Sequence, residues 1–258
     1  MRPDTPDSEA AMTEEALTLT RGDGHQIAVR RRRGDGPGVM FLGGFLSDMT
    51  GTKATHLDGW AAETGRAFTR FDYFAHGASS GAWEDATISR WRDDALTVLD
   101  EATDGAQILV GSSMGGWMAL LAAMARPDRV KALVLIAPAA DFTEALMWES
   151  FPLHVREAIE TEGQWMAPSA YGPPYAITKR LIEDGRQWSI LNAPIPVTCP
   201  VRILQGHGDR DVPWTHAVRT MEALESQDVT LHLSKSGDHG LSSEADLARL
   251  TAAIEAIG

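Results

Sequence analysis

Apolar residues recur along the chain with two spacings, and the changes between them predict strands followed by helices. Residues 16–20 and 26–30 alternate with period two around Gly22-Asp23-Gly24, which predicts an antiparallel hairpin. Further strands are predicted at 39–42, 67–72, 107–110, 132–137, 201–206 and 229–233, and helices at 50–64, 88–103, 117–125, 213–226 and from 242 onward. Strands that alternate with helices predict an α/β fold, with a mostly parallel twisted sheet and helices on both faces.

Residues 141–196 break this rhythm with closely spaced prolines and aromatic residues. They predict a small helical cap, made of short helices and turns, over the carboxyl edge of the sheet. The alternative is an irregular excursion that only covers the core. Residues 1–13 are acidic and predict a flexible tail, so that residues 14–258 form one domain. Because this start resembles neither a secretion signal nor an Arg-rich transit peptide, the sequence predicts a cytoplasmic protein.

Composition narrows the classes of function. The 258 residues are 43% hydrophobic, which suits one sizeable core, and the net charge of -13 disfavours nucleic acid and anionic membranes as partners. The single cysteine, Cys199, excludes an intrachain disulfide and a cysteine-rich metal site. No apolar run reaches the roughly 20 residues of a membrane span. The one basic run, residues 30–33, is interpreted as a solvated strand edge.

The segment Gly111-Ser112-Ser113-Met114-Gly115 matches the G-x-S-x-G nucleophile elbow, with a predicted strand before it and a predicted helix after it. Such a turn is tight, and we expect side chains at Gly111 or Gly115 to collide with the neighbouring strand and helix. A phosphate-binding loop is disfavoured, because no Lys-Ser or Lys-Thr pair follows the glycines and no G-x-G-x-x-G is present. Ser113 is therefore the predicted nucleophile.

A serine nucleophile needs a base and an acid that orients the base, in the chain order Ser, Asp or Glu, His. His239 lies in the loop after the last predicted strand and is the predicted base. Asp209 follows the strand at 201–206 and is the preferred acid. Asp211, two residues further on, is the alternative and could instead cap the next helix. Asp238 is disfavoured because adjacent side chains seldom face each other.

The reaction also needs amide donors for the oxyanion that forms on the acyl carbonyl. One is predicted to be the amide of Met114, directly after the nucleophile. The second is predicted in the loop Gly43-Gly44-Phe45-Leu46, where the glycines allow a close approach to substrate, and the amide of Phe45 is the candidate. The alternative is that the two glycines only form a turn.

With these residues placed, the chain resembles the α/β-hydrolase superfamily over nearly its whole length. It is most similar to the branch that contains mycophenolic acid acyl-glucuronide esterase and palmitoyl-protein thioesterase activities. The stretches that carry the resemblance are Gly44-Phe-Leu-Ser-Asp-Met-Thr-Gly-Thr-Lys-Ala, Arg70-Phe-Asp-Tyr, Gly111-Ser-Ser-Met-Gly-Gly-Trp, Ala193-Pro-Ile-Pro-Val-Thr-Cys-Pro-Val-Arg-Ile-Leu, Asp211-Val-Pro-Trp and Gly237-Asp-His. The resemblance implies Ser113, Asp209 and His239 as a catalytic triad. Gly43 departs from it, because such loops often carry proline or histidine there.

The expected function is that of a serine carboxylesterase, which cleaves small to medium acyl esters through an acyl-enzyme. The first alternative is a palmitoyl-type thioesterase that uses the same triad, and a remote one is a non-catalytic binding module with a hydrolase fold. The expected partner is a small-molecule ester or thioester, with no metal and no organic cofactor. The sequence leaves open whether the protein forms a homo-oligomer.

Overall fold

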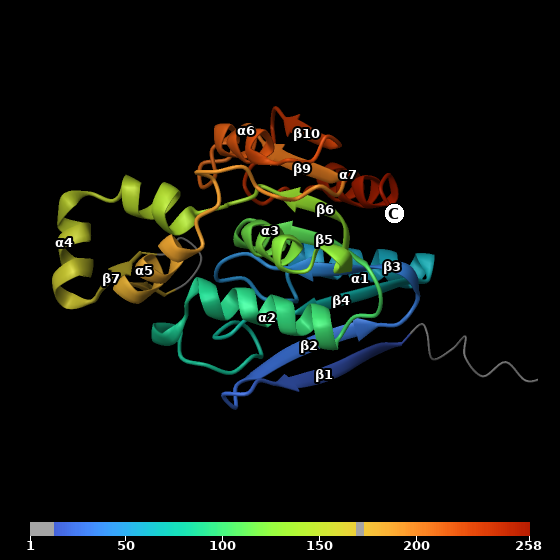
Figure 1. Cartoon of the computed structure of the whole chain (residues 1–258), viewed down its shortest axis with the longest axis horizontal. Coiled ribbons are helices and arrows are strands. Elements are labelled where there is room, and N and C mark those ends of the chain that lie inside the picture. Colours follow the sequence, from blue (N-terminus) through green and yellow to red (C-terminus); the bar gives the residue numbers. More distant parts are fainter. Residues whose placement is uncertain (1–12, 169–172) are drawn as a thin grey trace, which may run out of the picture.

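A computed structural model describes residues 13–168 and 173–258, and it is built around one eight-stranded sheet (Figure 1). The strand order is β1-β2-β4-β3-β5-β6-β9-β10. The strands are β1 (Glu14–Thr20), β2 (Gln26–Arg32), β3 (Asp35–Leu42), β4 (Arg66–Phe71), β5 (Gln107–Ser112), β6 (Val130–Ile136), β9 (Val201–Gly206) and β10 (Val229–Ser234). The β1–β2 and β2–β4 pairs are antiparallel and all other pairs are parallel. The predicted hairpin and the mostly parallel sheet are confirmed.

Helices cover both faces of this sheet. The helices α2 (Ile88–Glu101), α3 (Met114–Ala125) and α6 (Trp214–Ala223) pack on one face, and α1 (Thr52–Thr64) and α7 (Glu244–Glu255) pack on the other. Two short helical turns, η2 (Trp83–Asp85) and η3 (Pro127–Arg129), complete this part of the chain. Among the described residues, no helix combines the length and the apolar character that a bilayer span requires.

The apolar runs become strands because each has two faces to bury. In β5, Leu109 packs into the core below α2 and α3, whereas Ile108 and Val110 pack into the core below α1 and α7. All three side chains are fully buried. A strand in which successive side chains point to opposite buried faces reads as a continuous hydrophobic run, which is the pattern at residues 107–110.

The insertion between β6 and β9 stands beside the sheet (Figure 1). Its elements are the helical turns η4 (Thr143–Met147) and η5 (Trp148–Ser150), the helices α4 (Leu153–Glu162) and α5 (Lys179–Gln187), and the strands β7 (Gln164–Ala167) and β8 (Tyr175–Thr178). They share a small core of Val155, Ile159, Ala167, Ile177 and Ile182. The antiparallel β7–β8 pair was not predicted, since only helices and turns were expected here.

Polar contacts tie this insertion to the body of the protein. At its base, the buried Asp141 carboxylate accepts hydrogen bonds from the amides of Ile190 and Leu191 at 2.9 Å, which joins the two ends of the insertion. The Ser89 hydroxyl at the start of α2 donates to Asp184 of α5 at 2.7 Å. The insertion is therefore anchored both at its own ends and on α2.

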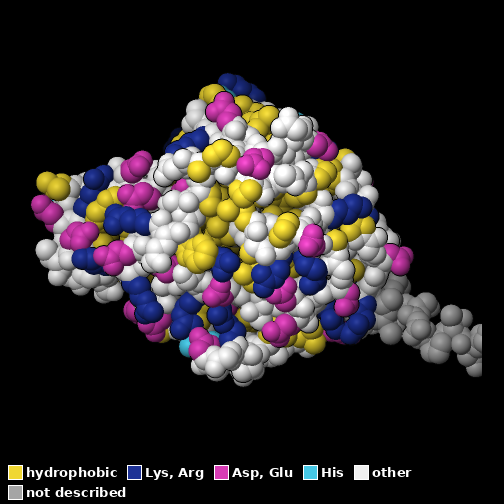
Figure 2. Space-filling model, viewed as in Figure 1, with side chains coloured by type: hydrophobic (Ala, Val, Ile, Leu, Met, Phe, Trp, Pro, Cys, Tyr) yellow, Lys and Arg dark blue, Asp and Glu magenta, His cyan; other side chains and the backbone are white. Residues whose placement is uncertain are grey.

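The interpretation of residues 30–33 as a solvated edge is wrong for part of the run. The outer strand is β1, and β2 is paired on both sides. The Arg32 side chain is buried and bonds the Asp58 carboxylate with Nη2 at 3.0 Å, while Arg31 pairs with Glu15 at 2.9 Å. On the face shown in Figure 2, Lys and Arg side chains lie next to Asp and Glu, around a more hydrophobic centre. The run is thus neutralised by neighbouring carboxylates.

Candidate active site

The predicted elbow is a sharp turn between β5 and α3. Ser113 alone separates the two elements, and its backbone has φ 55° and ψ −118°, a region that costs a non-glycine residue free energy. The turn is held by a 2.8 Å bond from the Ser113 amide to the Ile136 carbonyl and a 2.9 Å bond from the Gly116 amide to the Ser113 carbonyl. The helix begins at Met114, three residues before its predicted start, directly behind the serine.

The two glycines beside Ser113 lack the space for a side chain. A Cβ at Gly111 would overlap the carbonyl of Gly115, and a Cβ at Gly115 would overlap the carbonyl of Leu42 in β3. The collision expected from the sequence is therefore present at both positions. Backbone atoms cannot turn away as a flexible side chain can, so the spacing of the motif follows from packing.

We expect Gly115→Ala to lower the free energy of unfolding by about 1–3 kcal/mol, the usual cost of overpacking. Gly59→Ala is the matched control, because Gly59 lies exposed in α1 and a Cβ there meets no atom within 4 Å. That variant should gain about 0.5–1 kcal/mol from the better helix propensity of alanine. Urea unfolding of both variants checks the pair, and equal stabilities would contradict the packing of the elbow described above.

The structure brings the three side chains predicted as a triad into one hydrogen-bonded chain. The His239 Nε2 atom lies 3.1 Å from the Ser113 Oγ atom, and the His239 Nδ1 atom lies 2.8 Å from the Asp209 Oδ2 atom. Because an ionised carboxylate only accepts, Nδ1 carries the hydrogen and Nε2 is left to accept from the serine hydroxyl. The residues come from the turn after β5, the turn after β9 and the loop after β10.

The Asp209 carboxylate is buried and saturated with donors. Its Oδ1 atom accepts from the amides of Asp211 and Val212, both at 2.9 Å, and its Oδ2 atom accepts from the Gln205 side chain at 3.1 Å besides His239. Burial alone would raise the pKa of Asp209, but the bonds from His239, Val212 and Asp211 outweigh it and lower that pKa below its ordinary value. The carboxylate is therefore held in the charged form that orients His239.

The other acidic candidates do not orient His239. Asp211 is exposed and reaches the Asp209 carboxylate only with its backbone amide, and α6 begins without a side-chain cap. The Asp238 Oδ1 atom accepts from the amide of Leu241 at 3.0 Å and so stabilises its own turn. Gln205, which the sequence reading missed, is a fully buried polar residue near the end of β9, and that position was the available signal.

The two residues predicted to supply the oxyanion donors lie in the lining of the pocket at Ser113. The amides of Phe45 and Met114 make no hydrogen bond to any of the described residues, and both residues line the same pocket as Ser113. Gly44 lies against the serine, since a Cβ on it would be 3.4 Å from the Ser113 Cβ. Two amides without a partner, in the same pocket as a serine hydroxyl, are suited to donate to an oxyanion that forms there.

The pocket at Ser113 measures about 890 Å³ and lies between the sheet and the insertion. Its lining is Phe45, Leu46, Ser47, Ser113, Met114, Ala139, Phe142, Leu146, Met147, Pro168, Pro173, Pro174, Tyr175, Asp211, Val212 and His239. The side chains away from Ser113 and His239 are mostly apolar. Trp117 and Met118 of α3 are fully buried in the core, Met166 is half exposed, and none of the three lines this pocket.

A smaller pocket of about 260 Å³ also reaches Ser113 and His239. Lys53 in the first turn of α1 lines it and donates to the Gly240 carbonyl at 2.5 Å, which holds the loop that carries His239. Burial lowers the pKa of Lys53.

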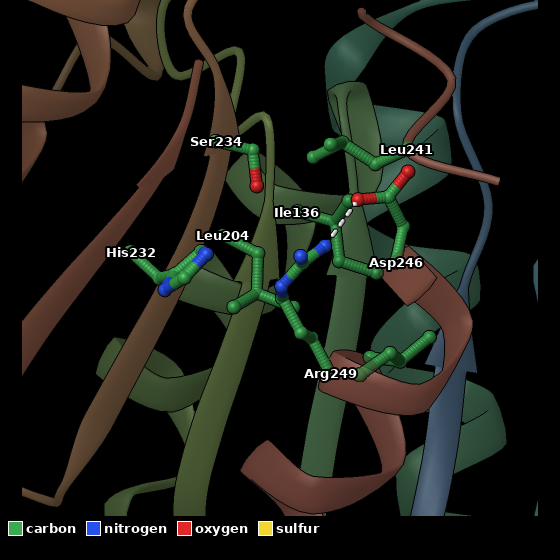
Figure 3. Close-up of a pocket in the computed structure, with 8 residues that line it drawn as sticks. Ile136, Leu204, His232, Ser234, Leu241, Asp246 and Arg249 are labelled. Carbon is green, nitrogen blue, oxygen red and sulfur yellow. Dashed lines mark hydrogen bonds and ion pairs between the residues drawn. The ribbon is translucent and has the colours of Figure 1, made fainter. Parts of the chain in front are cut away.

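Another hollow lies between the end of the sheet and α7, where Figure 3 shows Arg249 reaching Asp246, with 2.9 Å between the paired atoms. Its volume of about 10 Å³ holds at most one water molecule.

Comparison with known proteins agrees with the fold and identifies relatives. A family model for the α/β hydrolase fold matches residues 59–176. The mouse palmitoyl-protein thioesterase ABHD10 is 40% identical over 239 residues, which cover 92% of this chain and 80% of that protein. The solved structure of alpha/beta hydrolase domain-containing protein 10 from mouse superposes with a TM-score of 0.87 at 39% identity, over 94% of this chain and 97% of that one. The solved structure of a putative hydrolase from Agrobacterium vitis S4 superposes with a TM-score of 0.89 at 42% identity, over 95% of this chain and 98% of that one.

These relatives correct one prediction. The mouse, rat and cattle ABHD10 proteins are named as mitochondrial, so the cytoplasmic location predicted from residues 1–13 is contradicted. The composition of a chain's first residues reports a compartment only where those residues are themselves the targeting segment.

The sequence identity, the aligned share of each chain and the shared fold all indicate the same family. The chain belongs to the α/β-hydrolase family of enzymes, in the branch of esterases and thioesterases that includes palmitoyl-protein thioesterase ABHD10.

Proposed function

We propose that this enzyme cleaves fatty-acyl thioesters, and the corresponding esters, through an acyl-enzyme on Ser113. The observation that carries the proposal is the hydrogen-bonded chain from Ser113 through His239 to Asp209, at the foot of a large and mostly apolar pocket. A non-catalytic binding role is disfavoured, because such a role needs neither a serine bonded to an imidazole nor free amides beside it. A fluorophosphonate probe tests this directly: labelling at Ser113 is expected, and a protein that stays unlabelled would contradict the proposal.

The geometry supports the following reaction. The Ser113 hydroxyl gives its proton to His239 Nε2 while its oxygen attacks the acyl carbonyl carbon. The amides of Phe45 and Met114 donate to the oxyanion of the tetrahedral intermediate. The bond to sulfur or oxygen then breaks, and the leaving group takes the proton from His239. Water attacks the acyl-enzyme by the same route, which releases the fatty acid and restores Ser113. The Asp209 carboxylate stabilises the His239 imidazolium both while the acyl-enzyme forms and while water cleaves it.

Thioesters of long acyl chains are favoured over the small to medium esters expected first. The pocket of about 890 Å³ is at the upper end of the usual range for small-molecule sites, and Phe142, Leu146 and Met147 present apolar surface to it. The mouse relative is named a palmitoyl-protein thioesterase. We therefore assign residues 141–196 the role of a cap over this pocket, with Pro173 contributing from the insertion.

The rate should rise with the length of the acyl chain. Burial of one methylene contributes about 0.8 kcal/mol, so kcat/KM should increase about fourfold per methylene until the chain fills the pocket. The measurement is a series of acyl-CoA thioesters from acetyl to palmitoyl, each kept below its critical micelle concentration. A maximum at acetyl would contradict the assignment of this pocket to the acyl chain.

A pair of variants separates filling of the pocket from a general effect of bulk on the insertion. Leu146→Trp should shift the optimum to shorter chains, because Leu146 lines the pocket. Leu153→Trp is the control, since Leu153 is 71% exposed on α4 and does not line the pocket. The same shift in both variants would show that the space in this pocket does not determine which acyl-chain length the enzyme prefers.

A further inference from the structure

The loop after β3, residues 43–51, carries a proposed oxyanion donor and is held from outside by the segment that follows β4. The amide of Leu46 donates to the His76 Nε2 atom at 3.2 Å, and the amide of Met49 donates to the Asp72 Oδ1 atom at 2.7 Å. Neither His76 nor Asp72 lines the pocket at Ser113. We call residues 43–51 the oxyanion loop. Its backbone is thus fixed by two side chains that do not reach the substrate.

The surroundings of His76 determine which ring nitrogen carries the hydrogen. Its Nδ1 atom lies 3.0 Å from the Phe74 carbonyl oxygen, which can only accept, so Nδ1 is the donor. Nε2 must then be unprotonated, because it accepts from the Leu46 amide. The ring is 4% exposed and packs edge-on against Tyr73, Trp83 and Trp91. Burial lowers the pKa of His76, which favours the neutral ring that this arrangement needs.

The oxyanion loop needs such a support because its backbone is strained at one residue. Leu46 has φ 59°, in the left-handed region that leucine rarely adopts. Leu46 is 47% exposed, so packing of its side chain does little to fix the backbone of the loop. The hydrogen bond to His76 acts on the strained residue itself, next to Phe45, whose amide is the proposed oxyanion donor.

We infer that His76 is a positioning residue, which keeps the Phe45 amide aimed at the oxyanion. This role rests on the proposed function. The oxyanion exists only in the intermediate and its flanking transition states, so loss of the support should lower kcat and leave KM nearly unchanged. A misplaced donor costs up to about 100-fold in rate.

Two variants at this one position test the role. The side-chain amide of Gln reaches the position of Nε2 and can accept from Leu46, whereas the shorter Asn reaches only the position of Nδ1. We expect His76→Asn to lower kcat by about 10–100-fold with KM within about twofold, and His76→Gln to recover most of the loss. His154→Asn is the control, since His154 is exposed on α4. Thermal unfolding of each variant accompanies the kinetics.

Nitrogen NMR of protein labelled at histidine gives a second measurement, which does not depend on activity. It should show His76 as a neutral ring protonated at Nδ1, with the signal assigned by its absence in His76→Gln. An imidazolium or the opposite tautomer would overturn the inference.

The kinetic results also distinguish a failure of the positioning role from a failure of the proposed function. Unchanged kcat in His76→Asn, or equal losses in both His76 variants with raised KM and lower stability, would overturn the positioning role alone. A wild-type enzyme with no hydrolase activity would remove the proposed function and this role with it.

Discussion

Ser113→Ala will reduce the turnover of a fatty-acyl thioester by about 10⁶-fold, the loss seen when a triad enzyme loses its nucleophile. The substitution removes the oxygen on which the proposed acyl-enzyme forms, while the pocket and the two free amides remain in place. The affinity for the substrate should therefore change little. The measurement is the rate of thiol release at saturating substrate, with the variant purified free of wild-type enzyme.

Ser112→Ala is the matched control for this loss. Ser112 is the last residue of β5 and is buried, and no hydrogen bond joins its side chain to His239 among the described residues. We expect its turnover to stay within about tenfold of the wild type. Activity retained in Ser113→Ala and lost in Ser112→Ala would move the nucleophile to Ser112.

Asp209→Asn will lower kcat by about 10⁴-fold, as replacement of the acid does in other Ser-His-Asp enzymes. The 2.8 Å bond from the His239 Nδ1 atom to Asp209 keeps the proton on Nδ1 and leaves Nε2 free to accept from Ser113. An amide that presents its NH₂ group to the ring favours the other tautomer, in which Nε2 carries the hydrogen and cannot act as a base. Steady-state kinetics at several pH values measure the loss.

Asp211→Asn separates the two candidate acids. Asp211 meets the Asp209 carboxylate through its backbone amide, which the substitution keeps, so the loss should be below tenfold. A larger loss in Asp211→Asn than in Asp209→Asn would show that the wrong acid has been assigned. Circular dichroism of both variants checks that the fold is intact.

The core of the fold was predictable because its signals are local. The run at residues 107–110 must bury both faces, which only an interior strand of a covered sheet allows. The glycines at 111 and 115 report a turn too tight for side chains. The position of His239 after the last strand followed from the chain order that the chemistry needs.

The parts that were missed depend on contacts between distant segments. The β7–β8 pair has four residues in each strand, too few for a clear alternation, and it is stabilised by packing against α4 and α5. The burial of Arg32 follows from the pairing of β2 with β4, which the local sequence does not specify. His76 acts on a residue 30 positions away, and no motif marks that partnership.

The central claim is that Ser113 attacks the acyl carbonyl while the amides of Phe45 and Met114 receive the oxyanion. A crystal structure of the enzyme after reaction with a long-chain alkyl phosphonate tests the nucleophile and the two amide donors together. We expect phosphorus bonded to the Ser113 Oγ atom, the phosphoryl oxygen about 2.7–3.1 Å from both amide nitrogens, and the alkyl chain in the pocket beside Leu146. Phosphorus on another residue, or a phosphoryl oxygen that points away from both amides, would contradict it.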